Sequence, residues 1–236
     1  MSRATDIAAA LDRTRARIAE AERAAGRPPG STLLIAVGKR MVLDDLRAAH
    51  DAGQRDFGEN YAQELRDKQA AWGGGDDVRW HFIGPLQSNK LKLLWGRVHL
   101  IHSLDSPDLL AQVTRRAAAA SPVGQDCLVQ VNMVGEARKS GVPPERLPAL
   151  LDAFATCPEV RCRGLMLIPP QLDSDDETRR CFAALRALAE RERAVPRPNV
   201  ELRELSMGMS DDFELAIAEG ATMVRIGTAI FGARPR

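Results

Sequence analysis

The segment DCLVQVNM, residues 126–133, is the strongest β-strand signal in this chain. A short apolar run of this kind is typical of a strand that is buried on both faces of a parallel sheet. Seven further short segments with strand character flank it along the chain, at 33–39, 56–60, 79–84, 98–104, 161–168, 199–207 and 222–227. Helical patterns separate these segments; one of them is the Pro-rich segment PPERLPALLDAFATC, which predicts a helix over 143–157. One more helix is predicted before the first strand, where Ile7, Leu11 and Ile18 recur at helical spacing.

Eight strands that alternate with helices in 236 residues predict a single (β/α)8 TIM barrel over residues 1–236, with an extra N-terminal helix. A doubly wound open sheet is the alternative, but it needs fewer strands. No composition break, low-complexity tract or repeat beyond the β–α alternation indicates a second domain.

The composition argues against several classes of partner. Lys and Arg number 33 against 32 Asp and Glu, so the formal charge is +1. This balance provides no electrostatic basis for nucleic acid or an anionic membrane as the main partner. The aromatic residues are six Phe, three Trp and one Tyr, too few for a base-stacking platform.

Membrane insertion, secretion and metal binding are not expected either. No apolar run approaches the roughly 20 residues that span a bilayer, and the charged N-terminus is unlike a signal peptide. The four cysteines lack CxxC spacing, which indicates reduced, buried thiols in a cytoplasmic protein. The histidines do not cluster near these cysteines, so no metal site is expected.

Functional groups of a (β/α)8 barrel lie just beyond the carboxyl ends of its strands. Lys39 has such a position after the first strand, where Val37 and Gly38 precede it, and Asn60 has the corresponding position after the second strand. Desolvation lowers the pKa of a lysine, which favours a role as a Schiff-base nucleophile. A solvated lysine at a strand end is the alternative, and the neighbouring Arg40 is compatible with it.

The loops after the seventh and eighth strands, SMGMSDD (206–212) and RIGTAIFG (225–232), combine glycines with hydroxyl side chains. A phosphate site in such barrels is frequently formed by these two loops and a short extra helix, here TAIF. Gly227 lets backbone N–H groups approach an anion, and Ser210 and Thr228 can donate hydroxyl groups. The alternative is that Ser210 caps the next helix and Gly227 is an ordinary turn residue. Two aspartates after Ser210 favour that alternative, since carboxylates repel a phosphate.

A lysine together with a phosphate site indicates pyridoxal 5′-phosphate (PLP), because its aldehyde needs an amine and its phosphate needs an anchor. Arg225, on the strand that leads into the second loop, would then lie near the pyridine ring. An arginine cannot accept a proton, so the ring nitrogen stays unprotonated and the cofactor is a weak electron sink. An ion pair of Arg225 with a carboxylate is the alternative. A phosphate-binding barrel without a covalent lysine is also open.

Several segments are similar to those of a known family across nearly the whole chain. The clearest are IAVGK (35–39), FGENYAQEL (57–65), WHFIGPLQSNK (80–90), LSMGMSDDFELAI (205–217) and GATMVRIGTAIFG (220–232). They resemble the pyridoxal phosphate homeostasis proteins (the YggS/PROSC-like family), which are similar to the barrel domain of alanine racemase standing alone.

The resemblance implies that Lys39 carries PLP as an aldimine. The expected cofactor-binding residues are Lys39 for the aldehyde, Asn60 and Arg225 for the ring, and Met209, Ser210, Gly227 and Thr228 for the phosphate loops. No catalytic residue is expected. Three departures from the family pattern stand out: Gly38 replaces a usual serine, Arg40-Met41-Val42 replaces Thr-Lys-Pro, and Pro85 replaces a histidine.

Two functions compete: a PLP homeostasis protein that binds, stores or transfers the cofactor, and an amino-acid racemase or other PLP-dependent enzyme. Racemisation needs a base on each face of the α-carbon. In the racemases that this barrel resembles, the second base is a tyrosine from a further domain, and this chain stops at Arg236. Its one tyrosine, Tyr61, starts a helix and is expected to pack on the barrel. The first function is therefore expected, for a monomer with apo PLP-dependent enzymes as candidate recipients.

Overall fold

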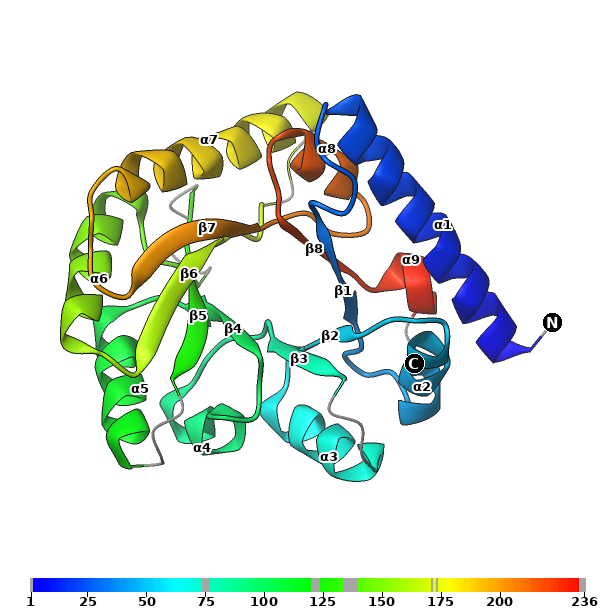
Figure 1. The fold of residues 1–236 in the computed structure, drawn as a ribbon, viewed down its shortest axis with the longest axis horizontal. Helices are drawn as coiled ribbons and strands as arrows, with labels where there is room; N and C mark the ends of the chain where they lie inside the picture. Colours follow the sequence, from blue (N-terminus) through cyan, green and yellow to red (C-terminus); the bar gives the residue numbers. More distant parts are fainter. Residues whose placement is uncertain are drawn as a thin grey trace.

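Eight parallel strands form a closed barrel in the computed structural model, and the last strand pairs with the first (Figure 1). The structure describes residues 2–73, 77–119, 124–133, 140–170, 172 and 174–233. In order around the barrel, the strands are β1 (Leu33–Val37), β2 (Asp56–Glu59), β3 (Arg79–Phe82), β4 (Leu100–Leu104), β5 (Gln125–Gln130), β6 (Val160–Met166), β7 (Val200–Ser206) and β8 (Met223–Ile226). The predicted TIM barrel, with each of its eight strands, is confirmed.

The strands are shorter than the sequence predicts, mainly at their carboxyl ends. Seven of the eight end one to three residues earlier; β1, for example, ends at Val37 rather than at residue 39. Backbone hydrogen bonds continue past several of these ends; the N–H of Gly38, for example, still donates to the carbonyl oxygen of Gly58 in β2. Lys39 and Asn60 consequently lie in loops rather than in strands.

Helices surround the barrel, as Figure 1 shows. The helices are α1 (Arg3–Ala24), α2 (Leu43–Asp51), α3 (Ala62–Trp72), α4 (Leu91–Leu94), α5 (Pro107–Ala119), α6 (Leu147–Ala153), α7 (Asp175–Arg193), α8 (Phe213–Ala218) and α9 (Thr228–Phe231). Single 3₁₀ turns stand at η1 (Ser88–Lys90), η2 (Pro144–Arg146) and η3 (Phe154–Thr156). The helix predicted over 143–157 is thus divided into η2, α6 and η3, in a stretch that contains prolines without a backbone N–H.

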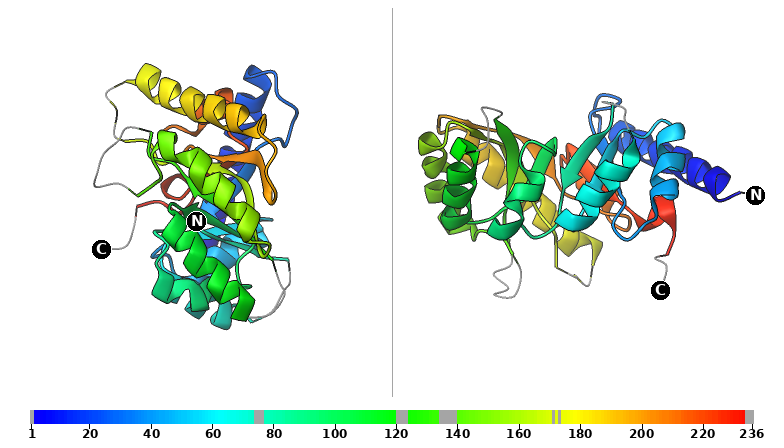
Figure 2. Two further views of the ribbon diagram at one scale, coloured as in Figure 1. Left: turned by 90° about the vertical axis from the view of Figure 1, so that its left-hand side faces the viewer. Right: turned by 90° about the horizontal axis from the view of Figure 1, so that it is seen from below.

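The extra N-terminal helix, α1, lies on the outside of the barrel against α2, α8 and α9, and Figure 2 shows it from two further sides. Ser2 caps this helix, since its side chain accepts a hydrogen bond from the N–H of Thr5. Ile7, Leu11 and Ile18 form its buried face, as predicted. No helix in the described ranges is long and apolar enough to cross a membrane.

Apolar side chains fill both sides of the strands. The larger cluster lies between the strands and the surrounding helices. The smaller cluster contains Ile35, Leu100, Leu128, Met166 and Met223. These residues come from β1, β4, β5, β6 and β8, and side chains from strands so far apart in the sheet can meet only inside the barrel. The interior is therefore a packed core, and a ligand must bind at one end of it.

Candidate functional site

Lys39 lies in a tight turn after β1, two residues beyond the end of the strand. The backbone N–H of Met41 donates to the carbonyl oxygen of Gly38 across this turn, at 2.9 Å. Arg40 has a left-handed backbone with φ of 62°, which is uncommon for a residue with a side chain. Its backbone N–H donates to Oε1 of Glu64 on α3, at 2.6 Å. α3 therefore holds the turn that presents Lys39.

A cavity of about 250 Å³ opens at the carboxyl ends of the strands. All seven residues that the sequence analysis singles out line it: Lys39, Asn60, Met209, Ser210, Arg225, Gly227 and Thr228. The remaining lining residues are Val37, Ile83, Ile168 and Asp211. The sequence assigned no site role to the three apolar residues, because an apolar residue near a strand end looks the same whether it faces a ligand or the core. Asp211 is one of the two aspartates that the sequence analysis weighed against a phosphate site.

The loop after β7 depends on a glycine. Gly208 has φ of +92°, and a Cβ at this position would lie 2.6 Å from Cβ of Ala216. Both the backbone angle and the contact therefore exclude a side chain here. The carbonyl oxygen of Gly208 accepts a hydrogen bond from the N–H of Arg225, at 3.0 Å, which fixes the loop to β8.

Ser210 joins the loops that follow β7 and β8. Its Oγ accepts a hydrogen bond from the backbone N–H of Ala229 in α9, at 3.4 Å. The alternative in which Ser210 caps the next helix is wrong, because α8 begins at Phe213 and its N-cap is Asp212. The carboxylate of Asp212 instead accepts from the N–H of Met209, at 2.5 Å. The two loops thus form one wall that holds both predicted hydroxyl groups.

Arg225 is 4% exposed and lines the cavity from β8. Its Nη1 donates to Oγ of Ser206 at 2.7 Å, and its Nη2 donates to the carbonyl oxygen of Leu167 at 2.9 Å. Both acceptors are neutral, so these contacts are not the ion pair considered as the alternative. Burial lowers the pKa of the guanidinium to about 10, which leaves it charged at neutral pH.

Asn60 follows β2 and is held against β3 at a glycine. A Cβ on Gly84 would lie 1.9 Å from the carbonyl oxygen of Asn60, so only glycine allows this approach. Oδ1 of Asn60 is buried, and no donor among the described residues reaches it. Buried polar atoms nearly always have a partner. An atom without one on a cavity wall is a position that a polar ligand can satisfy.

The sequence matches known proteins along almost its whole length. Residues 10–235 match the family model described as alanine racemase, N-terminal domain. The pyridoxal phosphate homeostasis protein of Pseudomonas aeruginosa is 46% identical over 228 residues, which cover 97% of this chain and 96% of that protein. The chain belongs to the family of pyridoxal phosphate homeostasis proteins.

Solved structures agree with this assignment. PipY of Synechococcus elongatus PCC7942 with PLP bound has a TM-score of 0.84 and 38% identity, covering 96% of this chain and all of that one. The alanine racemase of Corynebacterium glutamicum has a TM-score of 0.69 and 19% identity, covering 98% of this chain and 62% of that chain. The second likeness concerns the fold alone. This chain therefore shares its barrel fold with alanine racemase.

Glu59, the last residue of β2, is a fully buried carboxylate. Its place at a strand end makes it a candidate functional residue from the sequence, with no role assigned. Its Oε1 accepts from Nζ of Lys68 at 2.7 Å, and the same ammonium donates to the carbonyl oxygen of Gly38 and to Glu64, both at 2.7 Å. Burial raises the pKa of Glu59 to about 7. Lys68 therefore ties β2 and α3 to the turn that carries Lys39. The signal in the sequence was a carboxylate at the end of a buried strand.

Two of this chain's departures from the usual family pattern have a structural account. A Cβ on Gly38, where the family usually has serine, would lie 2.8 Å from Oε1 of Glu59. The glycine therefore leaves room for the contact between Glu59 and Lys68. Pro85, where the family usually has histidine, is exposed and does not line the cavity.

Tyr61 does not pack on the barrel, contrary to expectation. It is 46% exposed and precedes α3 as its N-cap residue. The guanidinium carbon of Arg40 lies 5.8 Å from its ring centroid. Because α3 begins directly after a loop at the mouth of the barrel, the Tyr61 ring lies at the surface and not beneath the helix. Tyr61 is not among the residues that line the cavity.

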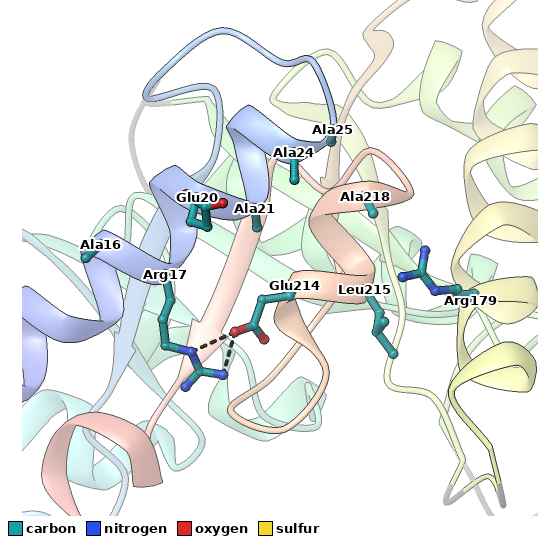
Figure 3. Close-up of a pocket in the computed structure, with 10 residues that line it drawn as sticks. All are labelled: Ala16, Arg17, Glu20, Ala21, Ala24, Ala25, Arg179, Glu214, Leu215 and Ala218. Atoms are coloured by element: carbon teal, nitrogen blue, oxygen red, sulfur yellow. Dashed lines mark hydrogen bonds and ion pairs between the residues drawn. The ribbon is translucent and has the colours of Figure 1, made fainter.

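A larger cavity, of about 660 Å³, lies between α1 and α8 (Figure 3). Half of its ten lining residues are alanine, and Arg17 pairs with Glu214 across it at 2.5 Å. It is on the outer surface of the barrel, away from the carboxyl ends of the strands. In this family fold, its size alone does not make it the functional site.

Proposed function

We propose that this protein binds pyridoxal 5′-phosphate at the mouth of the barrel and stores or passes on the cofactor without substantial turnover of amino acids. The single cavity that all seven expected residues line carries this proposal. A relative with 38% identity, solved with PLP bound, supports it. In this proposal, residues 1–236 act as one PLP-binding domain.

The cavity offers a group for each reactive part of the cofactor. When bound, PLP supplies an aldehyde, which condenses with a primary amine with loss of one water. Lys39 is the amine on the cavity wall. Ser210 and Thr228 offer hydroxyl groups to the phosphate, beside the backbone of Gly227 and Met209.

Two residues are proposed for the pyridine ring. Arg225 is a buried cation that cannot accept a proton at neutral pH, so it favours an unprotonated ring nitrogen. Such a ring stabilises a carbanion weakly, which suits storage better than catalysis. Asn60 offers a buried oxygen that has no donor among the described residues.

The racemase alternative needs a second base opposite Lys39. The chain's only tyrosine, Tyr61, is half exposed and lies outside the cavity lining. This supports a binding protein over a racemase.

The proposed setting is the cytoplasm, where the four free cysteines stay reduced. We further propose that the protein acts as a monomer and that apo PLP-dependent enzymes receive the cofactor from it.

The test is the absorption spectrum of purified protein with PLP, before and after borohydride reduction, followed by mapping of the modified peptide. We expect a visible band that borohydride removes, with the label on the peptide that contains Lys39. Lys39→Ala should lack the band while keeping a cooperative unfolding transition, and Lys92→Ala is the matched control. A label on another peptide with Lys39 left unmodified contradicts the assignment.

A further inference from the structure

A row of polar side chains crosses the interior of the barrel from Arg225. The guanidinium donates to Oγ of Ser206 on β7, which lies 2.9 Å from Nδ1 of His102 on β4. Nε2 of His102 lies 3.0 Å from Nδ1 of His81 on β3, and Nε2 of His81 lies 3.0 Å from Oδ1 of Asp56 on β2. None of these five residues is more than 4% exposed. We call them the polar row.

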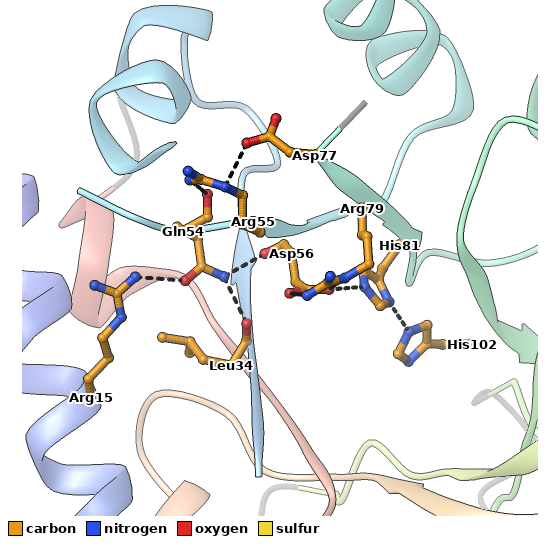
Figure 4. A network of polar contacts seen from close by, with 9 residues as sticks. All are labelled: Arg15, Leu34, Gln54, Arg55, Asp56, Asp77, Arg79, His81 and His102. Atoms are coloured by element: carbon orange, nitrogen blue, oxygen red, sulfur yellow. Dashed lines mark hydrogen bonds and ion pairs between the residues drawn. The ribbon is translucent and has the colours of Figure 1, made fainter. Parts of the chain in front are cut away.

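The polar row connects the two ends of the barrel. β5 and β6 separate β4 from β7 in the sheet, so the contact between His102 and Ser206 spans the interior. Asp56 and Arg79 are the first residues of β2 and β3, at the end opposite the cavity. Arg79 clamps Asp56 there with two hydrogen bonds, of 2.7 and 2.5 Å (Figure 4). Its own side chain reaches solvent.

The donor in each of these hydrogen bonds follows from the protonation states. Burial alone raises the pKa of Asp56, but the hydrogen bonds from His81 and Arg79 bring it below its ordinary value, so Asp56 is an acceptor. His81 therefore carries its proton on Nε2. Burial lowers the pKa of both histidines, so each is neutral and has one acceptor nitrogen. His81 accepts on Nδ1, which requires that His102 donate from Nε2.

The remaining links are then determined. Neutral His102 must accept on Nδ1, so the hydroxyl of Ser206 donates to it. Arg225 can only donate, so a lone pair of the Ser206 hydroxyl oxygen accepts the hydrogen bond from its guanidinium. Every hydrogen bond in the polar row is thus donated in the direction of Asp56. Hydrogen bonds aligned in this way strengthen one another in a low-dielectric interior.

We propose that Ser206, His102, His81 and Asp56 are positioning residues that hold Arg225 in a single orientation toward the ring nitrogen of PLP. The inference rests on the proposed function for the part that concerns PLP. A buried guanidinium is costly when its charge is uncompensated. Its hydrogen-bond acceptors, Ser206 and Leu167, are neutral. The charge of Asp212 raises the pKa of the guanidinium against the effect of burial, and the polar row additionally connects Arg225 to the carboxylate of Asp56. Loss of a link leaves Arg225 without its oriented acceptor.

The first experiment uses apo protein labelled with ¹⁵N-histidine and needs no PLP. We expect both His81 and His102 to be neutral, with the proton on Nε2 and a hydrogen-bonded Nδ1 in each. Ser206→Ala should shift the Nδ1 resonance of His102. Asp56→Asn should shift the His102 resonances too, although the two residues do not touch. The polar row is overturned if either histidine ring is doubly protonated or carries its proton on Nδ1. It is also overturned if the His102 resonances do not change in Asp56→Asn.

The second experiment measures PLP affinity and the absorption maximum of the bound cofactor. Ser206→Ala should weaken binding about tenfold and move the maximum, since one charge-assisted hydrogen bond to Arg225 is lost. The matched control is Thr14→Val, which removes an equally buried hydroxyl on α1. Unchanged affinity and maximum in Ser206→Ala overturn the positioning role. If the wild type binds no PLP, the proposed function fails, while the histidine resonances still test the polar row.

Discussion

At the scale of single residues, the cavity separates Lys39, the proposed covalent group, from the hydroxyl groups that are proposed to bind the phosphate. Lys39 is presented by a turn that α3 holds through Glu64 and Lys68. Ser210 and Thr228 belong to the opposite end of the chain, on loops that follow β7 and β8. The proposed covalent and phosphate contacts can therefore be removed independently.

The two hydroxyl groups are expected to account for much of the phosphate affinity. Charge-assisted hydrogen bonds contribute about 1.5–3 kcal/mol each, so Ser210→Ala/Thr228→Ala should weaken PLP binding by about two orders of magnitude or more. Titration of the PLP absorption band measures this. Each single variant serves as a control and should lose part of the affinity. A double variant that binds PLP as the wild type does would show that the phosphate lies elsewhere.

Glu59 should make the stability of the apo protein depend on pH. Burial raises its pKa from 4.5 to about 7, so the folded state holds a proton that the unfolded state releases between these values. The unfolding free energy should therefore fall as pH rises through this window, by an amount on the order of 3 kcal/mol. Glu59→Gln should remove this fall. Urea unfolding of both proteins from pH 5 to 8 isolates the effect, since other titrating groups cancel in the difference. A difference of the opposite sign would mean that Lys68 keeps the carboxyl ionised.

At the scale of elements, the loop between β7 and α8 depends on Gly208. Gly208→Ala should lower the free energy of unfolding by more than about 1–2 kcal/mol, which is the cost of a left-handed backbone for a residue with a side chain. The loss should exceed this cost because the added Cβ would also overlap the side chain of Ala216. It should also weaken PLP binding, since Met209 and Ser210 follow directly. Gly30→Ala is the matched control: φ there is +75° and no atom lies within 4 Å of the added Cβ. Chemical denaturation and PLP titration of both variants measure the two effects. Equal losses in the two variants would mean that the contact with Ala216 is unimportant.

At the scale of the whole molecule, we expect binding without turnover. A general base contributes about 10²–10⁴ in rate, so a site without the second base should fall below the roughly 1 s⁻¹ of ordinary enzymes. We expect no appreciable racemisation, transamination or decarboxylation of common amino acids. The PLP-loaded protein should instead reactivate an apo PLP-dependent enzyme mixed with it. Turnover at about 1 s⁻¹ that disappears in Lys39→Ala would overturn this expectation, and turnover that persists there would indicate a contaminating enzyme.

The pattern of the chain was sufficient to predict every strand and the barrel, but not where each element ends. The segment 33–39 reads as one apolar run, yet β1 ends at Val37. The N–H of Gly38 still donates to the carbonyl oxygen of Gly58 in β2, and the chain then enters the turn that the N–H of Met41 closes. The segment 143–157 has helical periodicity, and the structure divides it. Periodicity reports which face is buried, whereas the end of an element depends on the backbone hydrogen bonds that neighbouring segments supply.

The sequence by itself determined the fold class, the family and seven of the eleven residues that line the cavity. Local periodicity, short motifs and the position of a residue after a strand depend only on order along the chain. The tertiary structure alone decided what surrounds those residues. Glu59 and Lys68 beneath the lysine turn, and the polar row behind Arg225, bring together residues up to 169 positions apart in the numbering, Asp56 and Arg225. The contacts of the polar row form only when β2, β3 and β4 face β7 and β8 across a closed barrel, and no spacing within one segment encodes them.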